Sequence, residues 1–240
     1  MKVMILAAGR GERMRPLTDH TPKPLLKVGG KPLIVWHLER LAKAGFKHIV
    51  INHAHLGSQI ELALGNGAQW GLSIQYSPET TALETAGGIA NAMHLLCEGA
   101  DDAPFLVVNG DTYTEIDFSQ LILQNNRLAH LVLVNNPPQH PAGDFAIDGS
   151  VFKHSGLLSD VGLLSDTAQP RYTFSGVGLY RSALFAKIKA GSSAKLAPLL
   201  REAMAHKQVS AQHYTGLWHD IGTPQRLQAL DEWLKQHEFK

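Results

Sequence analysis

The sequence predicts an α/β protein built as a Rossmann-like three-layer α/β/α sandwich, with a mixed, mostly parallel central sheet between two layers of helices. Short apolar runs of strand length alternate with longer segments of helical periodicity, which is typical of a largely parallel sheet crossed by helices. The first apolar run ends in a glycine-rich loop, as parallel strands often do where a ligand binds. Because the chain has 240 residues, it is long enough for one large core.

The first 135 residues show the clearest alternation. Lys2–Ala7 has the pattern of a buried strand, and a long polar loop follows it as far as Lys31. Pro32 suits the first position of a helix, and Gly45 suits its end. The periodicity then predicts, in order, a strand at 48–52, a helix at 58–64, a strand at 72–76, a helix at 87–96, a strand at 105–108, a helix at 116–123 and a strand at 128–134.

The second part of the chain contains two hairpin signals. Phe145–Phe152 holds an Asp148-Gly149 turn between apolar residues, and Thr215-Gly216 separates the apolar runs 209–214 and 217–221. Residues 154–170 resemble a loop in composition. The other expected elements are a strand at 172–180 and helices at 181–189, 195–206 and 224–237. No Ser-, Gly- or Pro-rich linker divides the chain, so we expect a single domain over 1–240.

Composition excludes several classes of partner. Lys plus Arg is 22 and Asp plus Glu is 21, a formal net charge of +1, so we expect neither a nucleic-acid partner nor a membrane partner. Cys97 is the single cysteine, which excludes an internal disulfide and fits a reducing compartment. The apolar run at the start of the chain is too short for a signal peptide or a membrane span. We therefore expect a cytoplasmic protein.

A basic, glycine-rich loop follows the first strand. It reads Leu6-Ala-Ala-Gly-Arg-Gly-Glu-Arg-Met14 and continues to Thr21-Pro-Lys-Pro-Leu25. Small residues let backbone N–H groups approach phosphate oxygens closely. Between Arg10 and Lys31, six basic residues stand against two acidic ones, a local charge of +4. This combination predicts a binding site for a polyphosphate.

Two common phosphate loops do not fit this segment. A dinucleotide-binding fingerprint needs a third glycine where Met14 stands, and an acidic residue at the end of the second strand, where Asn52 stands. A dehydrogenase-type Rossmann protein is therefore disfavoured. A P-loop requires Ser or Thr after the lysine, but Pro32 follows Lys31.

Two acidic residues end apolar runs and are candidates for a metal site. Asp111 follows a buried strand, at the end of a sheet where ligands bind. Asp220 also follows apolar residues and precedes a turn. Because the two are 109 residues apart, only the fold can unite them.

The coupled segments Leu6–Met14 and Pro22-Lys-Pro24 resemble the signature of the sugar-phosphate nucleotidyltransferases, the nucleotide-sugar pyrophosphorylases. The resemblance covers essentially the whole chain. It implies the nucleotide-diphospho-sugar transferase fold, with a nucleotide-binding half at 1–135 and a sugar-binding half at 136–240. It also implies a reaction in which a sugar 1-phosphate and a nucleoside triphosphate give a nucleotide sugar and pyrophosphate.

Three short segments narrow the resemblance. Leu83–Gly88, Asn109-Gly-Asp111 and Phe174-Ser-Gly176 most resemble the uridylyltransferase branch that acts on UTP and N-acetylmuramate 1-phosphate in peptidoglycan recycling. The alternatives are mannose 1-phosphate guanylyltransferase and glucose 1-phosphate thymidylyltransferase, because the loop does not select base or sugar. A catalytically silent nucleotide-sugar sensor on the same fold is a further alternative. The family's acyltransferase extension is absent, so a bifunctional enzyme is not expected.

The resemblance also implies roles for individual residues. It assigns Mg²⁺, for which Mn²⁺ can substitute, to Asp111 and Asp220, the leaving pyrophosphate to Arg13 and the bridging of phosphates to Lys23, which together form the catalytic set. The implied nucleotide-binding residues are Leu6, Ala7, Ala8, Gly9, Gly11, Arg13, Lys23, Glu79, Gly87, Gly88 and Asn109. The implied sugar-binding residues are Glu84, Asn109, Asp144, Ser175, Gly176 and Lys195.

One departure concerns the cation for the sugar phosphate. Many family members carry a Glu-Lys-Pro step after the middle hairpin, and this chain has none. Lys153 and Lys195 are the two candidates to replace that lysine. Muramate also carries a lactyl carboxylate, which we expect Lys195 or Arg201 to recognise. The sequence leaves open whether the protein is a monomer or a small homo-oligomer.

Overall fold

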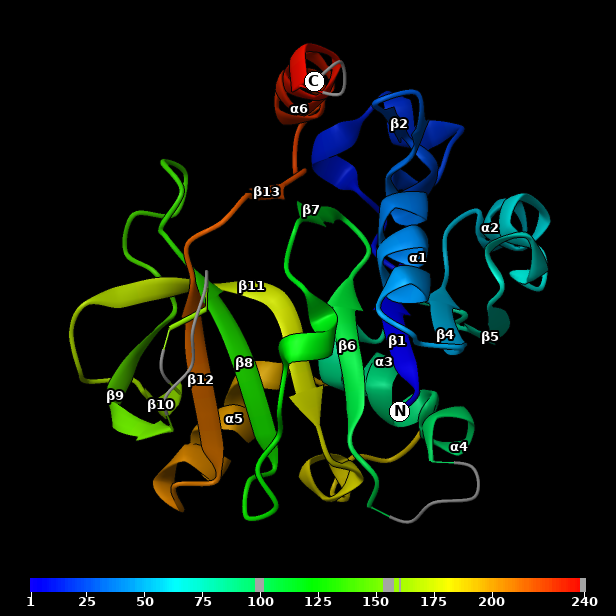
Figure 1. Ribbon diagram of the computed structural model, residues 1–240. Coiled ribbons are helices and arrows are strands. Elements are labelled where there is room, and N and C mark those ends of the chain that lie inside the picture. The colour runs from blue at the N-terminus through cyan, green and yellow to red at the C-terminus, as the bar shows by residue number, and fades with distance from the viewer. Residues whose placement is uncertain (98–101, 153–157, 160, 238–240) are drawn as a thin grey trace.

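The computed structural model describes residues 1–97, 102–152, 158–159 and 161–237, and it confirms the α/β class. A mixed sheet of nine strands runs through the molecule in the order β5-β4-β1-β6-β11-β8-β12-β10-β9 (Figure 1). Strands β1, β4, β5 and β6 are mutually parallel, and β11 runs antiparallel to β6. The bounds are β1 Val3–Leu6, β4 His48–His53, β5 Ser73–Pro78, β6 Phe105–Asn109, β8 Ala129–Val134, β9 Phe145–Phe152, β10 Val161–Ser165, β11 Arg171–Tyr180 and β12 Val209–Tyr214.

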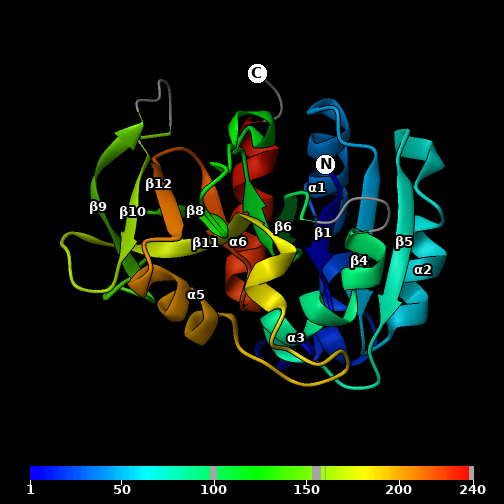
Figure 2. The same cartoon turned by 90° about the horizontal axis from the view of Figure 1, so that it is seen from below.

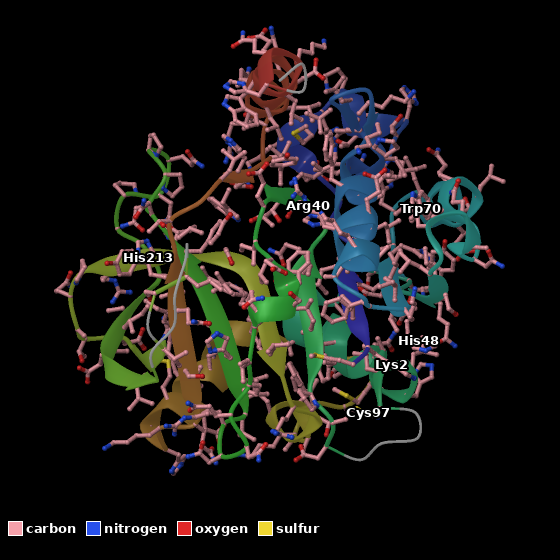
Figure 3. All side chains as sticks on the ribbon, in the orientation of Figure 1. Lys2, Arg40, His48, Trp70, Cys97 and His213 are labelled. Atoms are coloured by element: carbon pink, nitrogen blue, oxygen red, sulfur yellow. The ribbon has the colours of Figure 1, made fainter. Side chains whose placement is uncertain are left out.

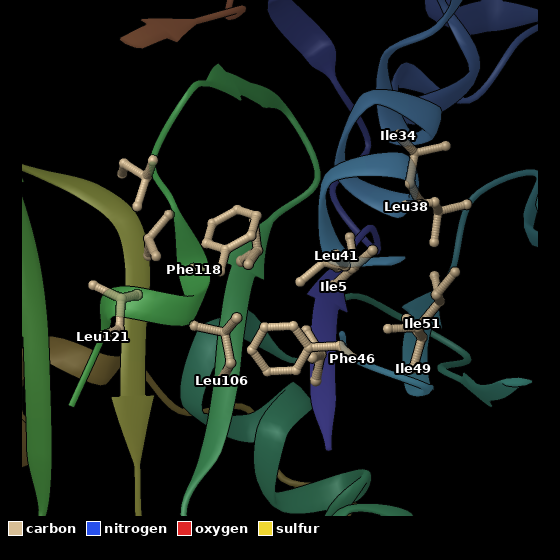
Figure 4. Packing of buried hydrophobic residues seen from close by; sticks show 14 of the residues in the cluster. Ile5, Ile34, Leu38, Leu41, Phe46, Ile49, Ile51, Leu106, Phe118 and Leu121 are labelled. Atoms are coloured by element: carbon tan, nitrogen blue, oxygen red, sulfur yellow. The ribbon is translucent and has the colours of Figure 1, made fainter. Parts of the chain in front are cut away.

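Helices cover both faces of this sheet. Helices α1 (Leu33–Lys43) and α2 (Gly57–Leu64) lie on one face, and α3 (Glu84–Asn91), α4 (Met93–Leu96) and α5 (Leu196–Ala205) lie on the other (Figures 1 and 2). Successive residues of a strand point to opposite faces, so Ile5 joins the α1 side of the core and Met4 joins the α3 side. Figure 4 shows the α1 side, where Leu38 and Leu41 pack over Ile5 and Ile51.

The two halves of the chain share this sheet. Strand β6, from the first half, pairs with β11, from the second. Strand β8, also from the first half, lies between β11 and β12. Because strands from the two halves alternate, neither half can form its sheet alone. We therefore propose that the chain folds as one domain, and that the boundary near residue 135 separates two binding functions.

A small cap lies beyond the carboxyl end of β1 (Figure 1). It consists of β2 (Lys27–Val28), β3 (Lys31–Pro32), β7 (Thr112–Thr114), β13 (Trp218–Asp220) and α6 (Pro224–His237). Its own apolar cluster includes Met14, Trp36, Tyr113, Ile221 and Leu230. This cluster joins the N-terminal loop to the last helix, so it brings together the distant segments that carry the predicted site.

The helix expected at 116–123 is wrong. The segment holds only one 3-10 turn, Phe118–Gln120, which begins at Asp117, whose carboxylate accepts a hydrogen bond from the backbone N–H of Ser119. Ile116 and Leu121 are buried against the sheet. No helix of the described residues covers this part of the face, so the apolar side chains of an irregular segment fill it instead.

The hairpin expected at Asp148-Gly149 is also wrong. Strand β9 continues through Gly149, whose φ of +65° accompanies a bulge in its pairing with β10. Strand β10 itself lies inside 154–170, where the composition predicted a loop. A glycine with positive φ serves a bulge as well as a turn, so the local signal alone does not choose between them.

The second expected hairpin, at Thr215-Gly216, does not form, because its two strands pair with other strands and not with each other. Residues 209–214 form β12, which pairs with β8 in the main sheet, whereas β13 pairs with β7 in the cap. The helix expected at 87–96 begins earlier, at Glu84, and is interrupted at Ala92. Pro32 ends β3 just ahead of α1 rather than starting the helix. Within the described ranges, no helix is both long and apolar enough to cross a bilayer.

Candidate active site

The carboxyl ends of β1, β4, β5 and β6 converge on a cavity of about 350 Å³. Ligands of open α/β sheets bind at this edge, and the volume lies in the range of small-molecule sites. Eight of the residues expected to bind the nucleotide or sugar, and the expected metal ligand Asp111, line this cavity; the eight are Leu6, Ala7, Ala8, Gly9, Lys23, Glu79, Glu84 and Asn109.

The two glycines of the loop differ in what surrounds them. Gly9 faces open space, with no atom within 4 Å of the position a Cβ would take, so a ligand can approach its backbone. Gly11 has a φ of +70°, and a Cβ there would lie 2.9 Å from the Thr18 methyl and 3.4 Å from Lys23 Cβ. Gly11 therefore folds the loop back onto Lys23.

A polar network that was not predicted from the sequence fixes the floor of the cavity. Asn52 Oδ1 accepts a hydrogen bond from the Ala7 backbone N–H at 2.9 Å, and its Nδ2 donates to Glu79 Oε1 at 2.7 Å. Glu79 Oε2 accepts from the Leu83 N–H at 2.9 Å. The Ala7 N–H is therefore committed to Asn52 and not to a phosphate. The sign of this network in the sequence was Asn52 at the end of β4, where a dinucleotide-binding protein would carry an acidic residue.

Gly87 and Gly88 are packing positions in helix α3. A Cβ at Gly88 would lie 2.8 Å from both Asn52 Nδ2 and Glu79 Oε1, and a Cβ at Gly87 would lie 2.3 Å from the Ser192 carbonyl oxygen. Both glycines are buried. Gly88 allows the helix to approach the Asn52–Glu79 network closely, and Gly87 allows it to approach the backbone of Ser192. Neither glycine lines the cavity.

Lys23 and Asp111 form the central ion pair of the site. Lys23 Nζ lies 2.5 Å from Asp111 Oδ2, and the lysine side chain is only 9% exposed whereas the aspartate side chain is 38% exposed. The Ile221 N–H donates to the Asp111 carbonyl oxygen at 3.1 Å, and Asp220 pairs with Thr112 in the β13–β7 ladder. The fold therefore brings the segment of Asp220 beside Asp111.

The two carboxylates fit a metal that the substrate helps to bind. Asp220 Oδ2 accepts a hydrogen bond from Arg226, which the sequence analysis did not single out. No group of three or more Asp, Glu, His or Cys side chains suited to a metal occurs among the residues that the structure describes. Mg²⁺ is commonly held by one or two carboxylates together with substrate phosphates. Asp111 and Asp220 match that donor set.

A buried histidine supports the backbone that follows Asp111. His37 on α1 bonds through Nε2 to the Thr112 carbonyl oxygen at 2.7 Å. Burial lowers the pKa of His37 to about 4, because a charged imidazolium is disfavoured in the core. His37 is therefore neutral at pH 7, with Nε2 as the donor.

On the sugar side, Asn109 and Gly176 lie in contact. A Cβ at Gly176, whose φ is +80°, would lie 2.5 Å from Asn109 Nδ2. The Ser175 hydroxyl is fully buried and donates to the Val132 carbonyl oxygen at 2.7 Å. Asp144 Oδ2 accepts from the Phe174 N–H at 2.8 Å. Ser175 and Asp144 thus hold the backbone of β11 near the cavity, and neither side chain lines it.

The candidate cations for the sugar lie in different surroundings. Lys195 precedes α5 and is exposed, and its neighbour Ala194 bonds to Leu83 and Ala86, next to the cavity wall. Arg201 Nε lies 3.0 Å from Asp166 Oδ2 on an exposed face. Lys153 lies outside the described residues.

The profile of the nucleotidyl transferase family matches residues 2–147. The chain belongs to this family. The match covers the glycine-rich loop, the Asn52–Glu79 network and the Lys23–Asp111 pair, so the resemblance of the loop is confirmed.

Relatives in this family differ in substrate. N-acetylmuramate alpha-1-phosphate uridylyltransferase of Neisseria meningitidis is 56% identical over 95% of both chains. Mannose-1-phosphate guanyltransferase of Yarrowia lipolytica is 38% identical over 64% of this chain and 45% of its own length. A Bacillus anthracis crystal structure, named as a candidate glucose-1-phosphate thymidylyltransferase, superposes with a TM-score of 0.79 at 23% identity, over 98% and 95% of the two chains. That likeness confirms the fold.

The single thiol does not line this cavity. Figure 3 shows Cys97 near Lys2, at the end of the sheet where β1 begins. The thiol of Cys97 contacts the Met93 sulfur at 3.3 Å across one turn of α4. Cys97 therefore packs as a small apolar residue and takes no part in the site.

Proposed function

We propose that this chain joins UTP to N-acetyl-α-muramate 1-phosphate, forming UDP-N-acetylmuramate and releasing pyrophosphate. The observation that carries the proposal is the Lys23–Asp111 ion pair at the cavity lined by the glycine-rich loop. The choice of substrates rests on the relative that is 56% identical over nearly the whole chain. We place the reaction in cytoplasmic peptidoglycan recycling, as the resemblance implies.

The nucleoside end of UTP would occupy the cavity beside the Asn52–Glu79 network. The open backbone at Gly9 faces this space. The triphosphate would extend from there toward Lys23 and then toward Arg13, because these are the basic residues of the loop to which the resemblance gives the phosphates. Every residue given a role here comes from one chain, so the proposal requires no partner subunit.

The chemistry requires positioning and charge more than proton transfer. An oxygen of the sugar phosphate attacks the α-phosphorus in line, the bond to the bridging oxygen breaks, and pyrophosphate leaves. Because the attacking oxygen is already an anion, no side chain has to remove its proton. The barrier arises mainly from bringing anions together, so fixed cations at the reacting phosphates lower it.

Each charged side chain then has one task. Lys23 would leave its contact with Asp111 and bind the phosphates at the reacting centre, and Arg13 would hold the leaving pyrophosphate. Asp111 and Asp220 would hold Mg²⁺, or Mn²⁺ in its place, which neutralises phosphate charge when bound. Lys23 is the cationic partner of Asp111 in the structure, and Mg²⁺ would replace it at this carboxylate.

Sugar recognition would come from the opposite wall. Asn109 and the backbone at Gly176 are in contact there, and Glu84 lines the cavity. Glu84 makes no ion pair among the described residues, and a carboxylate accepts hydrogen bonds only, so it would face hydroxyl or amide donors of the sugar. Lys195 is exposed and follows Ala194, which bonds to Leu83 and Ala86 beside the cavity, and it would receive the lactyl carboxylate.

The experiment is pyrophosphate release with Mg²⁺ over a matrix of the common nucleoside triphosphates and sugar 1-phosphates. The proposal predicts the strongest signal with UTP and N-acetylmuramate 1-phosphate. If another pair gave the strongest signal, the family assignment would stand and the proposed substrates would be replaced by that pair. Silence in every pair, from folded protein that still binds UTP, would favour the nucleotide-sugar sensor.

A further inference from the structure

We infer that Arg226 completes the binding site for the leaving pyrophosphate, as a second guanidinium beside Arg13. This inference rests on the proposed function and adds a residue outside the glycine-rich signature. Arg226 lies in the first turn of α6, more than two hundred positions along the chain from Arg13.

The two guanidinium groups meet over Gly222. The position of a Cβ on Gly222 lies 2.6 Å from Arg226 Nη2 and 3.0 Å from Arg13 Nη2. These two nitrogens are therefore no more than 5.6 Å apart. A tetrahedral phosphate has oxygens that can bond to two such groups at once, and guanidinium is well suited to this contact.

The net positive charge around Arg13 and Arg226 favours the binding of an anion. Arg226 Nη1 contacts Asp220 Oδ2 and also lies 3.3 Å from the Asp220 carbonyl oxygen. Arg13 has no carboxylate within ion-pair distance in the described part of the chain. Only one of the two guanidinium groups is thus paired with a carboxylate among the described residues, which leaves an excess positive charge that a phosphate would neutralise.

Both arginines are held by buried neighbours. Met14, next to Arg13, is fully buried, and Leu230, one turn beyond Arg226, is 1% exposed. Both belong to the apolar cluster of the cap, together with Ile221. The two cations therefore converge because the cap core joins the N-terminal loop to α6.

The pair is also adjacent to the reacting centre. Ile221, which precedes Gly222, donates its N–H to the Asp111 carbonyl oxygen at 3.1 Å, and Asp111 bonds to Lys23. A triphosphate whose α-phosphate lies at Lys23 and Asp111 would bring its outer phosphates toward Gly222. Asp220, if it holds the proposed metal, would no longer engage Arg226, and the Arg226 guanidinium would be available to bind those phosphates.

The test measures binding of inorganic pyrophosphate and of UMP by calorimetry, with and without Mg²⁺. Arg226→Gln should weaken pyrophosphate binding about 10- to 100-fold, the range expected for lost charge-assisted hydrogen bonds, and leave UMP binding within about twofold. Arg226→Lys should restore part of the loss. Lys187→Gln is the matched control, because Lys187 also pairs with a carboxylate, that of Glu202, on an exposed face and does not line the cavity.

A second variant keeps both charges. Gly222→Ala places a methyl group between the guanidiniums and should weaken pyrophosphate binding without affecting UMP. Unchanged pyrophosphate binding in Arg226→Gln, or equal losses for pyrophosphate and UMP, would overturn the inference. Wild-type protein that binds pyrophosphate but forms no nucleotide sugar would instead contradict the proposed function.

Discussion

Lys23 Nζ lies 2.5 Å from Asp111 Oδ2, although the two residues are 88 positions apart in the chain. Gly11 packs on the lysine from one side, and the strand after Asp111 is tied to His37. The lysine is nearly buried, so its charge is weakly screened and acts strongly on a nearby anion. This pair is the charged centre around which the proposed reaction is arranged.

Removal of the lysine should abolish most of the turnover. Lys23→Ala should lower kcat by about 100-fold or more, the range seen when a fixed charge at a transition state is lost. Lys27→Ala is the control, because Lys27 lies in the same segment and is exposed. Steady-state kinetics measures both, and near wild-type turnover in Lys23→Ala would contradict the role given to this residue.

The metal dependence should follow the two carboxylates. Asp111→Asn and Asp220→Asn should each raise the Mg²⁺ concentration for half-maximal activity at least about tenfold, because a neutral amide binds Mg²⁺ more weakly than a carboxylate. Asp166→Asn, which alters an exposed ion pair with Arg201, should leave this concentration unchanged. Mg²⁺ titrations of the three variants distinguish the outcomes, and equal Mg²⁺ curves would remove the two aspartates from the metal site.

The parallel strands and the loop could be predicted from the sequence because their signals are local. Apolar runs such as 105–108 and the glycine-rich loop at Leu6–Met14 carry their own pattern. The residues that complete the site do not. Asn52 gains its importance from Glu79, and Arg226 from Arg13, and both partners lie far along the chain. The failed hairpin at Thr215-Gly216 shows in the same way that a turn signal does not specify which strand is the partner.

Glu84 adopts a backbone conformation that suits glycine. Its φ is +61°, and its side chain lines the cavity. A residue other than glycine in this region is strained by about 1–2 kcal/mol, and such strain often marks a functional position. Glu84→Gly should therefore raise Tm by about 2–4 °C and lower kcat/KM for the sugar phosphate.

Two further variants separate the effects at Glu84. Glu84→Ala removes the carboxylate and keeps the strain, so it should lower kcat/KM without the gain in Tm. Lys207→Gly is the control, because Lys207 has a φ of +56° at an exposed helix end; it should raise Tm and leave activity unchanged. Full activity in both Glu84 variants would show that the carboxylate does not contact the sugar.

The stability of the protein should fall in mild acid because of His37. Burial lowers its pKa to about 4 in the folded protein, against about 6.5 in the unfolded chain. Between these values the unfolded chain binds the extra proton, so stability decreases as the pH falls, by about 2 kcal/mol at pH 5 from this group.

Urea unfolding at pH 7.5 and pH 5.0 measures this effect. His37→Gln should lose about 2 kcal/mol less stability than wild type over this interval, whatever its stability at pH 7.5. His48→Gln, at an exposed position, should behave as wild type. Identical losses in wild type and His37→Gln would exclude His37 as the source.

Lys195 should distinguish muramate from its parent sugar. Lys195→Ala should raise KM for N-acetylmuramate 1-phosphate about tenfold and leave KM for N-acetylglucosamine 1-phosphate nearly unchanged, since only the first carries a lactyl carboxylate. Lys187→Ala, which removes an exposed ammonium paired with Glu202, serves as the control. Equal effects of Lys195→Ala on both sugars would remove it from carboxylate recognition.

The most direct test of the proposed activity is a competition experiment. Equal concentrations of N-acetylmuramate 1-phosphate and N-acetylglucosamine 1-phosphate are incubated with UTP, Mg²⁺ and the protein, and the nucleotide sugars are identified by mass spectrometry. We predict that UDP-N-acetylmuramate predominates from the earliest time points. Predominance of UDP-N-acetylglucosamine, or the absence of any nucleotide sugar, would contradict the proposed function.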